Sequence, residues 1–158
     1  QLLKEDAEIE FKEKDFILDK TRHSVSVKDG AIQAEDIVTQ YLENKKSRKC
    51  NKILIVCNTI KKAQALYEEL KTQLGEIEEL NLFHSRYIRQ DRKKLEKEIR
   101  RFGKTYCDEK NKILDCQNGI WISTSLVEVS LDIDFDYLFT ELSELNGLFQ
   151  RMGRCTFS

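Results

Sequence analysis

Apolar residues recur along this chain with two spacings, one typical of amphipathic helices and one typical of buried strands. Segment 52–57 (KILIVC) is an almost continuous apolar run, as expected for a central parallel strand that is covered on both faces. Segment 61–74 instead places Ala63, Leu66 and Leu70 on one helical stripe. The predicted elements, in chain order, are helix 31–45, strand 52–57, helix 61–74, strand 79–83, helix 89–102, strand 120–123, strand 135–139 and helix 145–152.

Strands that alternate with helices of this length favour βαβ crossovers and a parallel sheet, so the expected fold class is α/β. Short alternating runs near the start of the chain, Ile9 with Phe11 and Val25 with Val27, predict half-buried strands at a sheet edge. Residues 103–118 are polar and predict a loop.

Composition excludes several classes of protein. The 158 residues include 27 Lys+Arg and 28 Asp+Glu, a formal net charge of -1, which argues against a histone-like or polybasic membrane-surface protein. Hydrophobic residues make up 40%, enough for the core of one domain, and no apolar run approaches the ~20 residues of a membrane span. Residues 1–19 do not resemble a signal peptide, and a chain that begins with Gln is expected to be a fragment of a longer protein.

Two familiar kinds of site are also excluded. The five cysteines are odd in number and include no CxxC pair, so we expect a reduced, intracellular protein without a metal site. The triplet Gly103-Lys104-Thr105 matches the end of a P-loop, but Glu98 stands where the first Gly is required. The triplet also follows a predicted helix rather than a strand. The chain therefore lacks the usual device for holding nucleotide phosphates.

Polar side chains gather where the predicted strands end. Because parallel sheets bind ligands at the carboxyl ends of their strands, these positions indicate where a site would lie. Hydroxyls, amides and helix N-termini there could hold a row of phosphates. Each residue taken alone is better explained as an ordinary helix N-cap, whereas the row taken together favours phosphate binding. The strand ends are Asn58-Thr59, His84-Ser85-Arg86, Thr124-Ser125 and Thr140-Glu141.

Basic residues are concentrated in one stretch of the sequence. Residues 86–112 hold eleven Lys or Arg and five Asp or Glu, whereas residues 113–158 hold two and seven. Most of the basic residues fall on predicted helix 89–102. A solvated charged face is the commoner explanation, so the helix by itself does not indicate nucleic-acid binding.

Four motifs in order resemble the C-terminal RecA-like lobe of superfamily 2 helicases. Segment 53–59 (ILIVCNT) looks like motif IV, and His84-Ser85-Arg86 with Asp91-Arg92 looks like the next element of that family. Segment 123–132 looks like motif V and 150–154 (QRMGR) like motif VI. The sequence of residues 127–136 (VEVSLDIDFD) is similar to that of the CRISPR-associated helicases of type I systems. The resemblance covers about residues 31–154.

This resemblance implies a three-layer αβα, RecA-like domain with a mainly parallel sheet. Residues 1–158 would form the second lobe of a helicase, with residues 1–30 as edge strands or a linker from the first lobe. In that family two lobes clamp ATP and translocate along single-stranded DNA, and a nuclease domain cuts the strand. The expected partners are therefore single-stranded DNA, the first lobe and nuclease domain of the same protein, and a CRISPR RNA-guided surveillance complex. The protein would be prokaryotic and cytoplasmic, with no membrane partner. ATP and Mg²⁺ would bind only the full-length protein, and this fragment alone would bind neither.

The resemblance also implies roles for individual residues. Backbone phosphates would be held by Asn58, Thr59, Ser85, Arg86, Thr124 and Ser125. On the ATP side, Ser130 and Asp132 would contact the nucleotide. The catalytic group would be Gln150, Arg151 and Arg154, with Arg154 reaching the γ-phosphate. Arg151 could instead be an ion-paired helix residue, and Asp132 a loop cap.

Two departures from the family pattern affect these roles. Ser125 stands where the family usually has Gln, and Phe157 stands where a further Arg is expected after motif VI. Full ATPase competence of this motif VI is therefore in question. Two other interpretations stay open: a lobe of another superfamily 2 helicase that acts on RNA or in DNA repair, and a non-catalytic doubly wound binding module.

Overall fold

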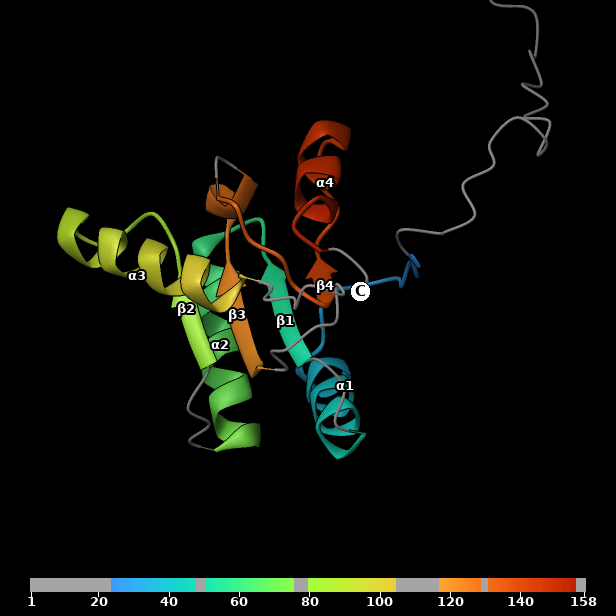
Figure 1. The fold of residues 1–158 in the computed structure, drawn as a ribbon. Coiled ribbons are helices and arrows are strands. Elements are labelled where there is room, and N and C mark those ends of the chain that lie inside the picture. Colours follow the sequence, from blue (N-terminus) through green and yellow to red (C-terminus); the bar gives the residue numbers. More distant parts are fainter. Residues whose placement is uncertain (1–23, 48–50, 76–79, 105–116, 129–130, 156–158) are drawn as a thin grey trace, which may run out of the picture.

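The computed structural model describes residues 24–47, 51–75, 80–104, 117–128 and 131–155. Its elements follow the predicted order of helices and strands (Figure 1). They are α1 (Ala34–Lys46), β1 (Asn51–Val56), α2 (Ile60–Leu74), β2 (Leu80–Phe83), α3 (Arg89–Phe102), β3 (Asn118–Ser123), the 3₁₀ turn η1 (Ser125–Glu128), β4 (Tyr137–Thr140) and α4 (Leu145–Met152).

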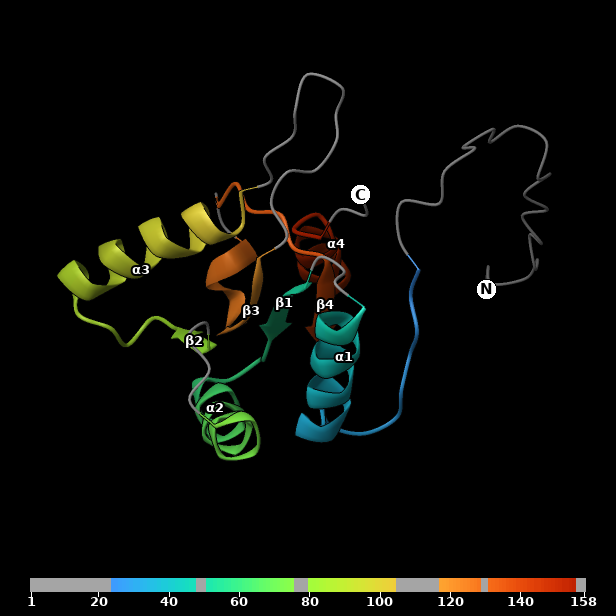
Figure 2. The ribbon, with the colours of Figure 1, turned by 60° about the horizontal axis from the view of Figure 1, so that its bottom comes forward.

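The four strands form one parallel sheet in the order β2-β3-β1-β4. Helices α1 and α2 cover one face, and α3 lies on the other face (Figure 2). Every residue of β1 is buried, because Ile53 and Ile55 face α1 and α2 while Leu54 and Val56 face α3 and the chain around η1. This three-layer α/β architecture confirms the predicted fold class.

Local sequence signals explain where α2 begins and ends and where α3 ends. Helix α2 begins after Thr59, whose hydroxyl accepts a hydrogen bond from the Lys62 amide at 3.3 Å, and it ends at Gly75 in a positive-φ conformation. Helix α3 ends at Gly103, where an added Cβ would lie 2.9 Å from the Ile133 side chain. Glycine therefore lets the chain before β4 pack closely against the end of α3.

Several elements begin or end one to three residues from their predicted bounds, and two predicted strands differ for a clear physical reason. Residues 24–27 form no strand, and Val25 and Val27 are 67% and 75% exposed, because none of the strands in the described ranges lies beside them. The companion strand predicted around residues 9–11 lies outside the described residues. The last strand begins at Tyr137 rather than residue 135, since Phe135 pairs in an isolated bridge with Cys155 beyond α4.

Among the helices of the described ranges, none combines the length and apolar character needed to cross a bilayer.

Candidate phosphate and nucleotide site

The sheet order brings the polar strand ends together along one edge. Val56 of β1 lies beside Ser123 of β3 and Thr140 of β4, so the residues that follow these positions are neighbours. The row therefore runs from the end of β2, through those of β3 and β1, to that of β4. Helix α4 stands beyond the arrowheads of β1 and β4 at this edge (Figure 1).

Arg151 of α4 links three of the chain segments at this edge. Its side chain is only 3% exposed. Both Nη1 and Nη2 donate to Asn58 Oδ1 at 3.2 Å, and Nη1 also donates to Thr140 Oγ1 at 2.9 Å and to the Glu141 carbonyl at 3.0 Å. The guanidinium therefore ties α4 to the ends of β1 and β4, as its planar set of donors permits.

Glu141 fastens the same loop from the other side. Its carboxylate accepts a hydrogen bond from the backbone N–H of Asn58 at 2.6 Å and another from Lys62 Nζ at 2.6 Å. Burial alone would raise the pKa of this carboxyl. These two hydrogen bonds, with the positive charges of Lys62 and Arg151, outweigh burial and lower the pKa below its ordinary value. The turn that connects β1 to α2 is thus held by charge-assisted hydrogen bonds on both sides.

The residues predicted to hold phosphates differ in accessibility. Ser85, Arg86, Thr59 and Ser125 are exposed, whereas Thr124 is only 6% exposed. Thr59 serves as the N-cap of α2, one of the two roles that the sequence left open. The row comes together as expected, and phosphate binding by its members stays a prediction.

Motifs V and VI meet at one open pocket of about 330 Å³. Ser125 at the start of η1 contributes to one side, and Gln150 and Arg151 of α4 contribute to the other. Gln150 is exposed, so its amide can reach a ligand in this pocket. The lining residues are Ser125, Ser143, Glu144, Asn146, Gly147, Gln150 and Arg151.

Arg154 lies just beyond α4 and contacts η1. Its Nε donates to the Val127 carbonyl at 3.1 Å, and its own carbonyl accepts from the Phe135 amide at 2.9 Å. Asp132 is exposed, and Ser130 lies outside the described residues. Across the described ranges, no group of three His, Cys, Asp or Glu side chains could hold a metal ion.

Sequence reasoning gave no role to two contributors to this edge. Lys62 and Glu141 form an ion pair across 79 positions of sequence, and neither belongs to a motif. The sequence signal that could have found this pair was a carboxylate at the end of one strand and a lysine in the first turn of the helix that follows another strand.

His84 at the end of β2 stacks on Tyr87, with ring centroids 4.5 Å apart. Burial, followed by the charge of Arg86, lowers the pKa of this imidazole.

Known structures share this architecture. The crystal structure of T. fusca Cas3 with ATP matches 82% of this chain and 14% of its own, with 27% identity and a TM-score of 0.60. The S. cerevisiae Dbp5 structure with RNA and ADP BeF3 matches 77% of this chain and 28% of its own at 19% identity, with a TM-score of 0.51, and shows the fold alone. The four-strand parallel sheet with its covering helices is therefore similar to the RecA-like lobe of these helicases.

Sequence comparison identifies the family. Residues 49–156 match the family described as "CRISPR-associated nuclease/helicase Cas3, C-terminal". The Escherichia coli K12 Cas3 endonuclease/helicase is 36% identical over 103 residues, 65% of this chain and 11% of that protein. Streptococcus thermophilus Cas3 is 33% identical over 123 residues, 77% of this chain and 12% of that protein. This chain belongs to the Cas3 C-terminal helicase family and spans about an eighth of these relatives.

Proposed function

We propose that this chain works as the second RecA-like lobe of an ATP-dependent single-stranded DNA translocase that unwinds target DNA for degradation in CRISPR interference. The observation that carries the proposal is the shared pocket, which is lined by Ser125 of motif V and by Gln150 of motif VI. Ser125 at the start of motif V would contact DNA and motif VI would contact ATP, so a common pocket gives the two contacts a physical connection. Family membership favours this function over the other helicase lobes and over a non-catalytic binding module.

On the DNA side, the exposed groups of the strand-end row would hold backbone phosphates. Ser85 and Ser125 carry hydroxyls that donate hydrogen bonds, and Arg86 adds a positive charge. The Thr59 hydroxyl accepts from Lys62 and can still donate its own hydrogen to a phosphate. The side-chain amide of Asn58 is already hydrogen-bonded to Arg151 and to the Leu142 carbonyl, so it would position the turn between β1 and α2 instead. Such contacts would not depend on base identity.

On the ATP side, Gln150 would face the nucleotide and Arg154 would stabilise charge on the γ-phosphate during transfer. ATP is the substrate here. The P-loop and the acidic motif that hold its phosphates and Mg²⁺ would come from a first lobe in the same longer protein. Together the two lobes would enclose the nucleotide.

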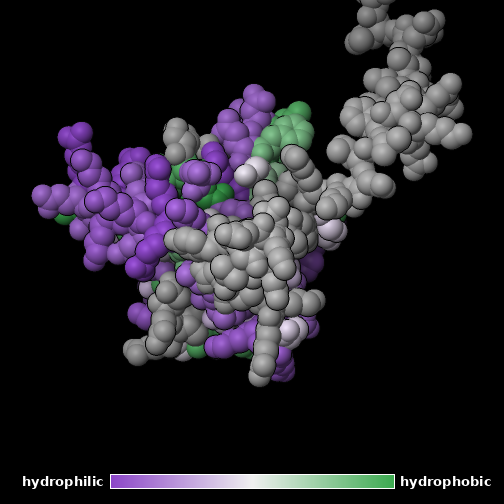
Figure 3. All heavy atoms as spheres, in the orientation of Figure 1, coloured by the Kyte–Doolittle hydropathy of each residue, from purple (hydrophilic) through white to green (hydrophobic). Residues whose placement is uncertain are grey.

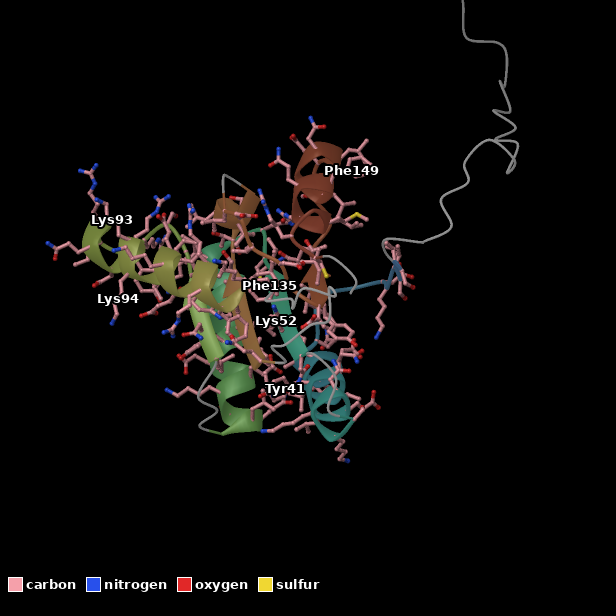
Figure 4. The ribbon with its side chains drawn as sticks, in the orientation of Figure 1. Tyr41, Lys52, Lys93, Lys94, Phe135 and Phe149 are labelled. Carbon is pink, nitrogen blue, oxygen red and sulfur yellow. The ribbon has the colours of Figure 1, made fainter. Side chains whose placement is uncertain are left out.

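An apolar stripe supports the presence of that first lobe. Leu142, Leu145 and Phe149 are 71%, 66% and 59% exposed, and they lie on α4 and the turn before it. Phe149 projects outward from α4 (Figure 4). Grouped exposed apolar side chains mark interaction surfaces, so we assign this stripe to the contact with the first lobe.

The wider assembly is proposed from one relative. A structure titled "CRISPR RNA-guided surveillance complex, pre-nicking" contains a chain that is 26% identical to this one, with a TM-score of 0.58 and coverage of 84% of this chain and 15% of its own. We propose that the longer protein joins a complex of the same kind.

The experiment that tests this function uses the longer protein that carries this lobe. Gln150→Ala should strongly lower ATP turnover stimulated by single-stranded DNA. Gln64→Ala, an exposed Gln on α2, is the matched control and should retain the parental turnover. Equal turnover in the two variants would contradict the proposal. Stimulation by RNA but not DNA would reassign the lobe to an RNA helicase.

A further inference from the structure

Helix α3 presents a basic surface that lies apart from the strand-end row. At about 100° per residue, six cations fall within about 140° of the helix circumference, opposite the buried Ile99 and Phe102. No carboxylate of α3 falls within this arc. We call this surface the basic face of α3. Its members are Arg89, Lys93, Lys94, Lys97, Arg100 and Arg101, all exposed.

Helix α3 is strongly positive, although the chain as a whole is almost neutral. Helix α3 holds seven Lys or Arg against three Asp or Glu, a local charge of +4, whereas the whole chain carries -1. The surface over α3 is strongly hydrophilic (Figure 3), and Lys93 and Lys94 lie on the part of the helix that extends away from the sheet (Figure 4). Within the part of the chain that the structure describes, Lys93 and Lys97 form no ion pair.

The residue types of the basic face favour duplex nucleic acid over a protein or a single strand as its ligand. Interfaces between proteins are depleted in Lys and enriched in aromatic residues, which this face lacks. Proteins that hold single strands add aromatic platforms for the bases, and the only aromatic residue of α3, Phe102, is buried. Lys93, Lys97 and Arg101 recur every four residues, at a rise of about 6 Å, on a rigid helix. A rigid row of cations suits the regular phosphates of a duplex.

We propose that the basic face of α3 binds the phosphate backbone of duplex DNA without reading its sequence. Helix α3 begins at Arg89, directly after the turn that carries Ser85 and Arg86 at the end of the edge strand β2. A duplex on α3 would therefore meet a single strand on the strand-end row at this corner of the sheet. That junction rests on the proposed function, whereas duplex binding by α3 stands independently of it.

The test measures fluorescence anisotropy of the 158-residue chain with a short labelled duplex of two different sequences, without ATP, over a salt series. The test variant is Lys93→Gln with Lys97→Gln. The matched control is Lys46→Gln with Lys71→Gln, two exposed helical lysines of α1 and α2 whose loss changes the net charge equally. Gln and Lys have similar helix propensities, and circular dichroism verifies folding of both variants.

The test variant should lose affinity on the order of 10-fold at moderate salt, and its log–log salt slope should fall by about 1.8 for two lost phosphates. The control should bind like the parent, and both duplex sequences should respond equally. Equal losses in test and control variants would overturn the proposal, because net charge alone would explain them. A loss of duplex affinity confined to one of the two sequences would also overturn the proposal. So would an equal loss, in the test variant, of affinity for labelled poly-glutamate or for a labelled single strand.

Failure of this proposal can be told apart from failure of the proposed function. Ser125→Ala changes an exposed hydroxyl of the strand-end row and leaves α3 intact. It should weaken binding of single-stranded DNA by the longer protein while the duplex affinity of the 158-residue chain is retained. Loss of duplex affinity in Ser125→Ala would place the duplex on the row and would overturn the assignment to α3.

Discussion

The guanidinium of Arg151 holds the side-chain amide of Asn58, with both terminal nitrogens 3.2 Å from Oδ1. These two residues are 93 positions apart, one in motif VI and the other in motif IV. The contact joins α4 to the turn that follows the central strand β1. In this structure Arg151 therefore positions the site, and its predicted part in catalysis is open to test.

Arg151→Ala should lower the free energy of unfolding by about 1.5–3 kcal/mol, because it removes the charge-assisted hydrogen bonds that this buried guanidinium donates to Asn58, Thr140 and Glu141. Arg151→Lys should recover little of the loss, because an ammonium cannot replace the planar set of donors. Urea unfolding of the 158-residue chain gives both values. If Arg151→Ala unfolded like the parent while ATP turnover in the longer protein collapsed, Arg151 would be catalytic rather than structural.

Thr59→Asp separates the two roles assigned to this residue. Asp caps helices about as well as Thr, so the stability of the chain should be retained, whereas Thr59→Ala should lose about 1 kcal/mol. The carboxylate would repel a phosphate, so Thr59→Asp should bind single-stranded DNA more weakly in the longer protein. Unchanged DNA affinity would leave Thr59 as a helix cap only.

The Glu141 carboxylate makes stability depend on pH. Because its folded pKa lies below the unfolded value, its contribution is present above the unfolded pKa of about 4.3 and is lost as the pH falls through the folded pKa. The difference in unfolding free energy between the parent and Glu141→Gln should therefore be constant from neutral pH down to about pH 5 and shrink below it. Glu69→Gln, an exposed residue of α2, is the control. A constant difference at all pH values would contradict the assigned hydrogen bonds.

The sequence predicted those features that depend on local pattern. KILIVC identified β1 because a strand covered on both faces has no polar alternation. The alternation of Val25 and Val27 was misleading, since alternation becomes a strand only when a neighbouring strand accepts its hydrogen bonds. The ends of the predicted strands located the strand-end row, but no pattern linked Arg151 to Thr140 or Lys62 to Glu141. Those contacts arise from the order of strands in the sheet, which tertiary packing sets.

The 158-residue chain alone should release no phosphate from ATP, with or without single-stranded DNA. The P-loop and the acidic motif would both lie in another lobe, so this lobe could not hold the β- and γ-phosphates or Mg²⁺ by itself. A coupled phosphate-release assay checks this expectation. Turnover stimulated by DNA in the isolated chain would show that one lobe suffices.

The most direct test of the central claim is ATP turnover, stimulated by single-stranded DNA, in the longer protein with Arg154→Ala. An arginine that stabilises the transferring phosphoryl group is worth roughly 10³–10⁵ in rate, so turnover should fall toward the lower end of that range while ATP binding is retained. The lower end is expected because Phe157 stands where the family has a further Arg. Turnover at the parental rate in Arg154→Ala would contradict the account of this chain as the second lobe of an ATP-dependent DNA translocase.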